Sequence, residues 1–476
     1  MKIRLIEPDA PSMHLWSHSY FVRLGLPMIG ARLKQLGHDV RIYNPQLAPI
    51  DWDDVHTAEL VGLSSTTSTT PATYAIADGL RRRRIPVIVG GSHVTFMADE
   101  ALEHVDYVAR GEGGETIMAE LVEALQGARE LESITGLSFK RDGAIVHNPL
   151  HEPCADLDTL PFPDLTLIAG HERLINTPIM TSWGCPFACN FCSVTAMFGR
   201  KYRFRSAESV IAEIKDKRPT RIFFYDDNMA ADKKRLKQLL RMMIDEGLVI
   251  PWSAQVRTDV VRDRELLDLM QESGCEIVYL GLESVNQATL DGYEKAQTVD
   301  DIVEGIRLLH EYGIRSHGMF VLGADTDDVQ TVRDTVTFAI KNRIDTVMLN
   351  ILTPLPGTPQ YEELDAAGRI FDKRWQLYDA HHVVFEPKLM TPYELQMEDL
   401  RGYMRFYSLR TWLRYIFALK FTKQLLFHWW GMVIIHNWRK DERNKAFIKA
   451  LRRMWPRPTP PGTVRSADGD GELRRS

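Results

Sequence analysis

Three cysteines lie within eight residues of one another near the middle of this 476-residue chain. Cys185, Cys189 and Cys192 follow a C-x3-C-x2-C spacing, and the chain has five cysteines in all. Thiolates hold the irons of iron–sulfur clusters, and a fully ligated [4Fe–4S] cluster needs four of them. Three thiolates on one short loop therefore predict a cluster in which one iron has no protein ligand. Such an open position is where a substrate or cofactor binds a protein-bound metal.

Zinc and disulfide sites explain these cysteines less well. A structural zinc site needs a fourth Cys or His nearby, usually in a second C-x2-C or H-x3–5-H pair. The nearest histidines, His151 and His171, lie upstream without such pairing. Three cysteines cannot all pair in disulfides with one another, and disulfides do not suit a chain of this size. The small number of cysteines indicates that the protein resides in a reducing cytoplasm. We therefore expect Cys154 and Cys275 to be ordinary residues rather than ligands.

The composition is that of a globular protein with more than one domain. Hydrophobic residues make up 44% and charged residues 26% of the chain, which is ordinary for globular proteins. The length predicts two to three domains. Met1–Glu7 has the pattern of a strand rather than of a secretory signal, so a cytoplasmic location is expected. The net charge of −6 gives no reason to expect a nucleic-acid partner.

Residues 1–150 alternate between short apolar segments and segments with helical spacing. A helix is expected from Leu26 to Leu36, ending at Gly37. The expected strands are Ile3–Ile6, Asp39–Tyr43, Leu60–Ser64, Val87–Val89 and Asp106–Ala109. Strands separated by helices predict an α/β fold with a doubly wound parallel sheet. Ligands bind such a sheet at the carboxyl ends of its strands.

The loops at these strand ends carry small and polar residues suited to holding a cofactor. Hydroxyl groups supply hydrogen bonds, and glycine lets the backbone approach a ligand closely. The candidate cofactor-binding residues here are Ser64, Thr66, Gly90, Gly91, Gly111 and Glu112. Any nucleotide-binding sheet has such loops, so they do not identify the ligand by themselves.

A second α/β unit is expected from 171 to 395, after a proline-rich linker over 151–170. Its strands are expected at Ile179–Met180, Arg221–Tyr225, Trp252–Val256, Ile277–Leu280, His317–Leu322 and Thr346–Ile351. Polar candidates for cofactor contacts stand at the ends of several of these strands: Asp226, Asp227, Asn228, Gln255, Arg257 and Glu283. The alternative for each acid is a helix N-cap or a surface charge.

The cysteine motif resembles the signature of the radical S-adenosylmethionine (radical SAM) superfamily. Gly184-Cys185-Pro186 begins the motif, and the aromatic Phe191 precedes its last cysteine. The resemblance implies a partial (β/α)6 barrel that opens at its carboxyl end. It also implies a [4Fe–4S] cluster whose open iron is chelated by the amino and carboxyl groups of S-adenosylmethionine, which an electron then cleaves to a 5′-deoxyadenosyl radical. Tyr225–Asn228 stands where the superfamily usually has a Gly-Gly-Glu motif.

Residues 1–150 resemble the cobalamin-binding domain that precedes many radical SAM enzymes. The matching segments are Leu26–Val40, Gly90–His93 and Arg110–Glu112. The D-x-H-x-x-G loop, whose histidine ligates cobalt in other cobalamin proteins, is missing, and neither His38 nor His93 has that context. The resemblance therefore implies cobalamin without a named protein ligand. A degenerate domain that no longer binds the corrin is the alternative.

The C-terminal extension over 396–456 differs in charge from the rest of the chain. Residues 401–455 contain thirteen Lys or Arg and two acids, a net of +11, together with five of the ten tryptophans. No run reaches the roughly 20 apolar residues that span a bilayer. Aromatic and basic residues together predict peripheral membrane contact, and a helical cap packed on the barrel is the alternative. A disordered tail is expected over 457–476.

The combined resemblance implies a cobalamin-dependent radical SAM C-methyltransferase that acts on an unactivated carbon. The basic aromatic extension indicates a lipid substrate, and the chain is similar to the bacterial hopanoid methylases, with C-3 methylation as the specific expectation. Flavodoxin or ferredoxin is the expected reducing partner. Two alternatives stay open: a radical SAM enzyme that forms porphyrin or lipid rings or crosslinks without methyl transfer, and a non-enzymatic iron–sulfur and cobalamin sensor at the membrane.

Overall fold

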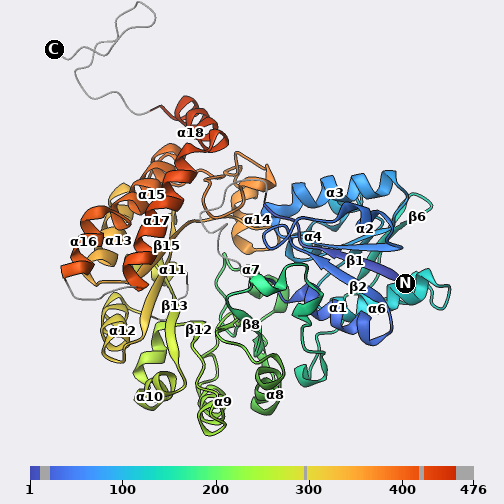
Figure 1. The fold of residues 1–476 in the computed structure, drawn as a ribbon. Helices are drawn as coiled ribbons and strands as arrows, with labels where there is room; N and C mark the ends of the chain where they lie inside the picture. The colour runs from blue at the N-terminus through green and yellow to red at the C-terminus, as the bar shows by residue number, and fades with distance from the viewer. Residues whose placement is uncertain (11–21, 294–296, 418–422, 457–476) are drawn as a thin grey trace, which may run out of the picture.

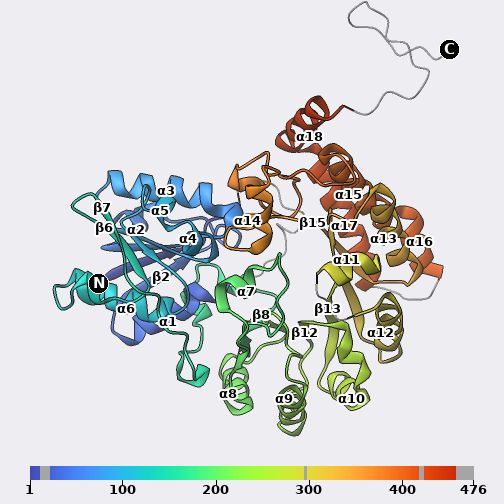
Figure 2. The same cartoon turned by 180° about the vertical axis from the view of Figure 1, so that it is seen from behind.

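A computed structural model describes residues 1–10, 22–293, 297–417 and 423–456 of the chain. Two α/β units lie side by side, and a group of C-terminal helices covers the second unit on the side away from the first (Figure 1, Figure 2). This arrangement confirms the predicted fold class of an N-terminal doubly wound sheet, a partial barrel and a helical extension.

The N-terminal sheet has seven strands in the order β2-β1-β3-β4-β5-β6-β7. They are β1 Lys2–Ile6, β2 Asp39–Tyr43, β3 Leu60–Ser64, β4 Val87–Gly90, β5 Tyr107–Ala109, β6 Leu137–Arg141 and β7 Ala144–His147. The first five are parallel, as predicted, whereas β6 and β7 are antiparallel and absent from the sequence prediction. Asp142 and Gly143, with φ of 50° and 82°, form the turn between them. An Asp-Gly pair is a hairpin signal, so this hairpin was accessible to prediction.

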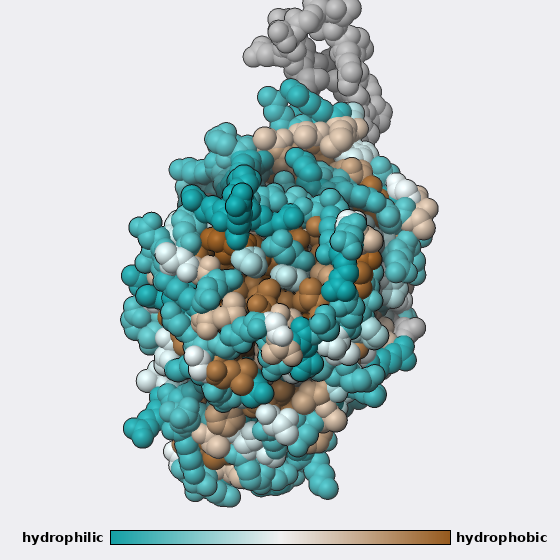
Figure 3. All heavy atoms as spheres, turned by 90° about the vertical axis from the view of Figure 1, so that its right-hand side faces the viewer, coloured by the Kyte–Doolittle hydropathy of each residue, from teal (hydrophilic) through white to brown (hydrophobic). Residues whose placement is uncertain are grey.

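Helices cover both faces of this sheet, and each face buries its own apolar cluster. One face packs against α1 Gly25–Gln35 and α6 Gly114–Leu125, and the other against α2 Trp52–His56, α3 Thr70–Arg82, α4 Ser92–Phe96 and α5 Ala98–Ala101. β1 lies between β2 and β3 in the sheet. The chain passes from β1 to β2 on one side and from β3 to β4 on the other, so the two connections leave a crevice at the carboxyl ends of β1 and β3, where ligands bind sheets of this kind. Seen from the right-hand side of Figure 1, the surface is mostly polar, with hydrophobic residues gathered near its middle (Figure 3).

The second sheet is entirely parallel, in the order β15-β14-β13-β12-β11-β8. Its strands are β8 Thr177–Ile179, β11 Ile222–Phe224, β12 Trp252–Val256, β13 Cys275–Glu283, β14 Arg315–Leu322 and β15 Thr346–Ile351, which match the six predicted segments. Around its outside lie α8 Ala207–Lys217, α9 Lys233–Asp245, α10 Arg264–Glu272, α12 Val299–Glu311 and α13 Val329–Lys341 (Figure 1). Smaller elements at its carboxyl end are β9 Ser182–Trp183, α7 Ser193–Phe198, β10 Arg203–Phe204, α11 Gln287–Gly292 and α14 Pro359–Ala366.

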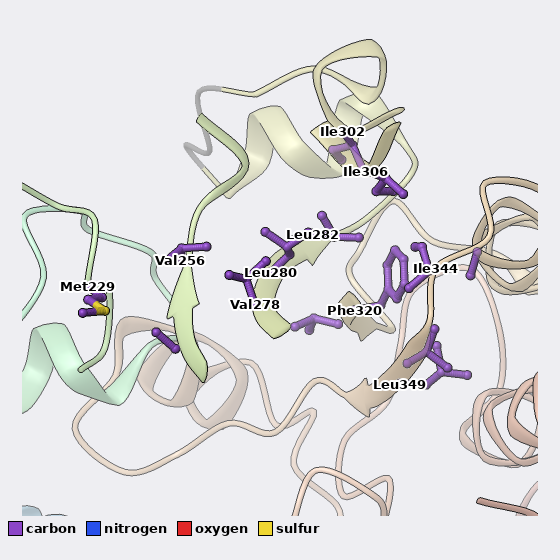
Figure 4. Close-up of a cluster of buried hydrophobic side chains, with 14 of the residues drawn as sticks. Met229, Val256, Val278, Leu280, Leu282, Ile302, Ile306, Phe320, Ile344 and Leu349 are labelled. Carbon is purple, nitrogen blue, oxygen red and sulfur yellow. The ribbon is translucent and has the colours of Figure 1, made fainter. Parts of the chain in front are cut away.

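The alternation of side chains along β13 separates the outside of the barrel from its inside. Leu280 and Leu282 are fully buried and lie in one apolar cluster with Ile306 of α12 (Figure 4). Tyr279 and Glu283 occupy the intervening positions, so they project from the opposite face of the strand. The polar residue that ends β13 therefore belongs to the inner face, at the open end of the barrel.

The C-terminal helices are α15 Pro392–Phe406, α16 Leu409–Phe417, α17 Lys423–Lys440 and α18 Glu442–Met454. α15 packs along β15, the last strand of the barrel, and α17 buries Ile435 and Trp438. The extension thus forms a cap on the barrel. In the described part of the chain, every helix is too short or too polar to cross a bilayer. The tail expected over 457–476 lies outside the described residues.

Candidate functional site

The three cysteines lie on the loop between β9 and α7, which we call the cysteine loop (residues 184–192). β9 pairs with β10 in antiparallel fashion, so the segment closes on itself. Gly184 has a φ of +81°, and a Cβ at this position would lie 2.4 Å from the carbonyl oxygen of Lys201. Only glycine fits here, because any other residue would be strained and would collide with that carbonyl. The loop is therefore held in one course directly before Cys185.

Aromatic contacts hold the cysteine loop against the ends of the barrel strands. The guanidinium carbon of Arg257 lies 3.8 Å from the ring centre of Phe187, in a cation–π contact. The ring of Phe191 meets that of Tyr293 edge-on, with their centroids 4.8 Å apart. Arg257, a predicted cofactor contact, thus supports the loop that carries the cysteines.

The cysteine loop suits a cluster better than a single metal ion. Among the residues that the structure describes, no three His, Cys, Asp or Glu side chains converge as ligands of one ion. In a cubane each thiolate binds a different iron, so the ligands surround a cluster instead of one point. All three cysteines are half-buried. Burial raises the pKa of the Cys192 thiol to about 11, and a coordinated metal would displace that proton.

Asp226 and Asp227 follow β11 but have different surroundings. Asp226 is fully buried and accepts hydrogen bonds from the N–H (3.3 Å) and the hydroxyl (2.8 Å) of Thr181 and from the hydroxyl of Ser182. It therefore fastens the strand that leads into the cysteine loop, and burial raises its pKa. Asp227 reaches the surface. The protein around it, and then the charge of Asp226, raise the pKa of Asp227 to about 6, although the Gly184 N–H donates to its carboxylate.

Asn228 and Glu283 bring further acceptor oxygens to this end of the barrel. Asn228 is 4% exposed, and its Oδ1 has no hydrogen-bond partner among the described residues; the same holds for Oδ1 of Asn190 on the cysteine loop. Glu283 has a φ of +59° where the register between β13 and β14 shifts. Strained residues of this kind cluster at binding sites. The amide of Gln255 lies 3.5 Å from the Asp226 carbonyl oxygen. The unsatisfied amide oxygens of Asn228 and Asn190 suit the amino group and ribose hydroxyls of S-adenosylmethionine.

The predicted residues after β3 and β4 lie together, in loops that pack on each other. A Cβ on Gly91, which has a φ of +120°, would lie 2.1 Å from the Ser65 carbonyl oxygen, and the Ser65 N–H donates to the Gly90 carbonyl at 2.8 Å. The Thr66 hydroxyl accepts a hydrogen bond from Arg23 at 3.3 Å. Ser64 is the half-buried end of β3. The glycine pair therefore allows the two loops to meet at the carboxyl edge of the sheet, where the corrin of a cobalamin domain would lie.

Glu112 joins the two domains. Its carboxylate accepts a hydrogen bond from Arg203 of β10 at 2.5 Å, and the two side chains are 5% and 10% exposed. The N–H of the neighbouring Gly111 donates to the Thr95 hydroxyl at 3.0 Å. Glu112, a predicted cofactor contact, is thus engaged by the element that pairs with the strand before the cysteines.

His93 is buried inside the protein, in contact with Glu100 and Trp375. Its Nε2 lies 3.5 Å from a carboxylate oxygen of Glu100, and its ring meets Trp375 edge-on with centroids 5.0 Å apart. The indole N–H of Trp375 donates to both oxygens of Glu100, at 3.0 and 3.1 Å. Because Trp375 comes from beyond the barrel, this cluster locks the two domains together at the carboxyl edge of the N-terminal sheet.

Glu7, Arg23 and Tyr225 connect the carboxyl ends of the two sheets; Glu7 and Arg23 were missing from the predicted site, and Tyr225 was predicted only as part of the segment Tyr225–Asn228. Glu7 follows β1, Arg23 lies just before α1, and Tyr225 follows β11. The guanidinium of Arg23 lies 3.4 Å from the carboxylate of Glu7, whose pKa is raised by burial. Burial also raises the pKa of Tyr225, and the charges of Arg23, Glu7 and Asp227 act on its phenol. The carboxyl ends of both sheets therefore lie near each other. Glu7 could have been selected from the sequence, because it is a charged residue directly after the first strand.

Two family profiles match the chain in separate regions. The radical SAM superfamily profile matches residues 179–339, and the B12-binding domain profile matches residues 17–121. An uncharacterized methyltransferase of Pyrococcus horikoshii is 30% identical over 403 residues, which cover 81% of this chain and 87% of that protein. A bacteriochlorophyllide d C-12(1)-methyltransferase of Chlorobaculum tepidum is 29% identical, covering 81% of this chain and 82% of that protein.

Two further relatives carry names with other substrates. An anaerobic magnesium-protoporphyrin IX monomethyl ester cyclase of Cereibacter sphaeroides is 30% identical, covering 74% of this chain and 60% of that protein. A hopanoid C-3 methylase of Methylococcus capsulatus is 26% identical, covering 82% of this chain and 78% of that protein.

Solved structures share the fold at lower sequence identity. The cobalamin-dependent radical enzyme OxsB, with aqua-cobalamin bound, has a TM-score of 0.69 at 14% identity and covers 95% of this chain and 75% of its own. The methyltransferase TsrM of Kitasatospora setae, with its tryptophan substrate and a SAM analog bound, has a TM-score of 0.64 at 20% identity, covering 77% of this chain and 76% of its own. The chain therefore belongs to the radical SAM superfamily, as an enzyme of its cobalamin-dependent methyltransferase group, and its cofactors are a [4Fe–4S] cluster, S-adenosylmethionine and cobalamin.

Proposed function

We propose that this enzyme, located in the cytoplasm at the inner face of the membrane, methylates an unactivated carbon of a lipid, with C-3 of a hopanoid as the specific target. The supporting observation is that the phenol of Tyr225, at the open end of the barrel, is within reach of the charges of Arg23 and Glu7 at the carboxyl edge of the N-terminal sheet as well as of Asp227. A substrate in the space between them would contact both cofactor-binding edges at once. When bound, the cofactors supply the one-electron chemistry and the methyl group.

The residues at the two edges have distinct proposed tasks. Cys185, Cys189 and Cys192 would hold the cluster, and Asp227, Asn228 and Glu283 would hold the amino group and ribose of S-adenosylmethionine. Gln255, Arg257 and Asp226 would position the cysteine loop through the contacts described above. The corrin would rest on the loops that contain Ser64, Thr66, Gly90, Gly91 and Gly111, while Glu112 keeps β10 in place beside them.

The lipid substrate is proposed on two grounds. Radical chemistry of this kind is needed only for carbons that ordinary acid–base chemistry does not activate, and saturated lipids have such carbons. One relative that covers most of this chain is named a hopanoid C-3 methylase. The basic, aromatic extension over 401–455 would add peripheral contact with the membrane in which such a lipid resides.

Reduction of the cluster requires an external electron, for which we propose flavodoxin or ferredoxin. Arg200 and Lys201 are exposed beside the cysteine loop, and the backbone of Lys201 lies directly against Gly184. Two cations at this point would attract an acidic electron carrier and bring it close to the cluster.

Ring formation without methyl transfer is the second candidate, because a porphyrin ester cyclase is 30% identical to this chain. The two reactions differ in product mass. A methylated product contains an additional CH2, whereas an oxidative ring or crosslink loses hydrogen and gains no carbon from S-adenosylmethionine.

The test is anaerobic incubation of the reconstituted enzyme with cobalamin, a flavodoxin reducing system, S-adenosylmethionine labelled in its methyl group, and a bacterial lipid extract. Mass spectrometry should find the label in a hopanoid, and Cys189→Ala should abolish both labelling and S-adenosylmethionine cleavage while Cys154→Ala retains them. Cleavage without label in any product would favour the cyclase. The absence of cleavage by the reduced, iron-loaded wild type would overturn both candidates.

A further inference from the structure

The outer surface of α16 and α17 displays a cluster of large apolar side chains. Six of them are between 40% and 62% exposed: Leu409, Leu413, Leu426, Phe427, Trp429 and Trp430. The indole N–H of Trp412 donates to the Leu425 carbonyl at 3.2 Å and so ties the two helices together. We call this surface the α16–α17 face. A contiguous exposed apolar surface of this kind marks an interaction site.

The exposed residues are not core residues on a loosely placed helix, because the other side of α17 is firmly packed. His428 is 0% exposed, Ile435 4% and Trp438 2%. A Cβ on Gly431 would lie 2.4 Å from the ring of Tyr407, so α17 sits tightly against the end of α15. The apolar side chains that remain outside are therefore surplus to the fold.

Charge decides which partner suits this face. Residues 401–440 contain eight Lys or Arg and no Asp or Glu, whereas residues 1–400 have a net charge of −18. Arg410, next to Leu409 on α16, is exposed. A second copy of the chain binding through the same face would bring two basic surfaces together, which like-charge repulsion opposes. An anionic surface is the complementary partner.

We propose that the α16–α17 face docks on the anionic lipid surface of a membrane. Trp, Phe and Leu side chains would enter the boundary between headgroups and acyl chains, and the neighbouring cations would pair with lipid phosphates. The α16–α17 face is close to the start of β14. Phe427 lies under the guanidinium of Arg315, 5.3 Å from ring centre to guanidinium carbon, and Arg315 is the first residue of β14.

The α16–α17 face thus lies by the amino ends of the barrel strands, whereas Asp227 and Glu283 lie at the carboxyl ends. It also lies on the side of the molecule away from the N-terminal domain (Figure 1, Figure 2). Docking would anchor the enzyme and leave the opening of the catalytic barrel turned away from the bilayer. The face is therefore an anchor and not an entry path for substrate, and the inference does not depend on the substrate proposed above.

The test is flotation of the full-length, cluster-loaded enzyme with vesicles of phosphatidylcholine alone or mixed with phosphatidylglycerol. The wild type should bind the mixed vesicles and release them as salt rises. The double variant Trp429→Glu/Trp430→Glu should lose about tenfold in bound fraction, because it places acids among the apolar side chains. Val249→Glu is the matched control, since Val249 is 56% exposed and lies between α9 and β12, outside the two helices that form the α16–α17 face.

Three outcomes would overturn the proposal. The first is equal vesicle binding by the wild type and the double variant. The second is a loss of vesicle binding in Val249→Glu as large as that in the double variant. The third is a wild type that binds no vesicles but forms a dimer, which the double variant abolishes. Iron content and far-UV circular dichroism show whether the variants fold. S-adenosylmethionine cleavage in solution should be the same in the double variant and the wild type, which separates anchoring from catalysis.

Discussion

The hydroxyl of Tyr403 forms two hydrogen bonds with one residue, Leu349: it accepts from the N–H and donates to the carbonyl, both at 2.8 Å. Tyr407, one helical turn later, does the same with Val347 at 3.0 and 2.9 Å. β15 is the edge strand of the barrel, so these backbone groups have no neighbouring strand on that side. Residues four apart on a helix and two apart on a strand rise by about 6 to 7 Å, so the two spacings match. The tyrosines of α15 thus close the edge of the sheet.

Removing the Tyr403 hydroxyl should destabilise the barrel. Tyr403→Phe would leave the N–H and carbonyl of Leu349 buried without partners, at a cost of about 1–3 kcal/mol. Urea unfolding should show a lower midpoint with an unchanged slope. Tyr312→Phe, at a half-buried tyrosine directly after α12, should unfold like the wild type. Equal midpoints for the wild type and Tyr403→Phe would refute the role of the hydroxyl.

The conformation of Gly184 should control assembly of the cluster. In Gly184→Ala the new Cβ would meet the Lys201 carbonyl oxygen, 2.4 Å away, and the cysteine loop would have to move. We expect iron per protein after anaerobic reconstitution to fall by about half or more. Gly199→Ala is the matched control, because Gly199 also has a positive φ (66°), but a Cβ added there would meet no other atom within 4 Å. If both variants retain full iron content, the loop does not depend on Gly184.

Substitutions of the two adjacent carboxylates should have different effects, because Asp227 is proposed to bind S-adenosylmethionine and Asp226 to support the cysteine loop. Asp227→Asn should weaken binding of S-adenosylmethionine by about tenfold or more, as expected for losing a hydrogen bond to a charged group. Asp226→Asn should instead lower the free energy of unfolding by about 2 kcal/mol, because an amide NH2 would face the donors of Thr181 and Ser182. Calorimetry with the ligand and urea unfolding measure the two effects. The reverse assignment of effects would contradict the roles proposed here.

His382 should make the C-terminal cap more stable in mildly acidic than in alkaline solution. Its Nδ1 faces the Asp379 carboxylate at 2.9 Å and its Nε2 faces Oδ1 of Asn444 at 3.1 Å; the Asn444 amide is oriented by donating to the Trp438 carbonyl. Both ring nitrogens must donate, so the ring is an imidazolium. Burial lowers its pKa, but Asp379 and Asn444 raise the pKa of His382 above its ordinary value on balance.

Because the folded state has the higher pKa, this stabilisation is complete below the ordinary value near 6.5 and is lost as pH rises through the folded value. Urea unfolding at several pH values gives the free energy of unfolding of the wild type and of His382→Phe. The difference between the two free energies should narrow from pH 6 to pH 9. A difference independent of pH would mean that His382 is neutral in the folded protein.

His428 should act in the opposite direction. It is fully buried and stacks on Phe406 with ring centroids 5.3 Å apart, and burial lowers the pKa of His428 from 6.5 to about 4. Because the folded state has the lower pKa, the free energy of unfolding is unaffected above pH 6.5 and falls by about 3 kcal/mol in total as pH falls from 6.5 towards 4. His428→Phe should lose less stability than the wild type between these pH values in urea unfolding. Parallel pH profiles for the two proteins would refute the assignment.

The amino-acid sequence by itself determined the features that depend on local spacing. The trio Cys185, Cys189 and Cys192 lies on one loop whatever surrounds it, and apolar segments separated by helical ones specify parallel strands. The positions at strand ends followed from the same pattern, which is why Asp227, Asn228 and Glu283 could be selected as candidates before their surroundings were known.

Only the tertiary structure decided which of those residues face one another. Glu112 meets Arg203, 91 residues along the chain, and Tyr225 lies near Glu7 and Arg23 from the other domain. The partners of Tyr403 lie 54 residues before it. Such contacts depend on how whole sheets and helices are placed against each other. That placement results from burial of apolar faces, which is non-directional and leaves no periodic signal linking residues so far apart.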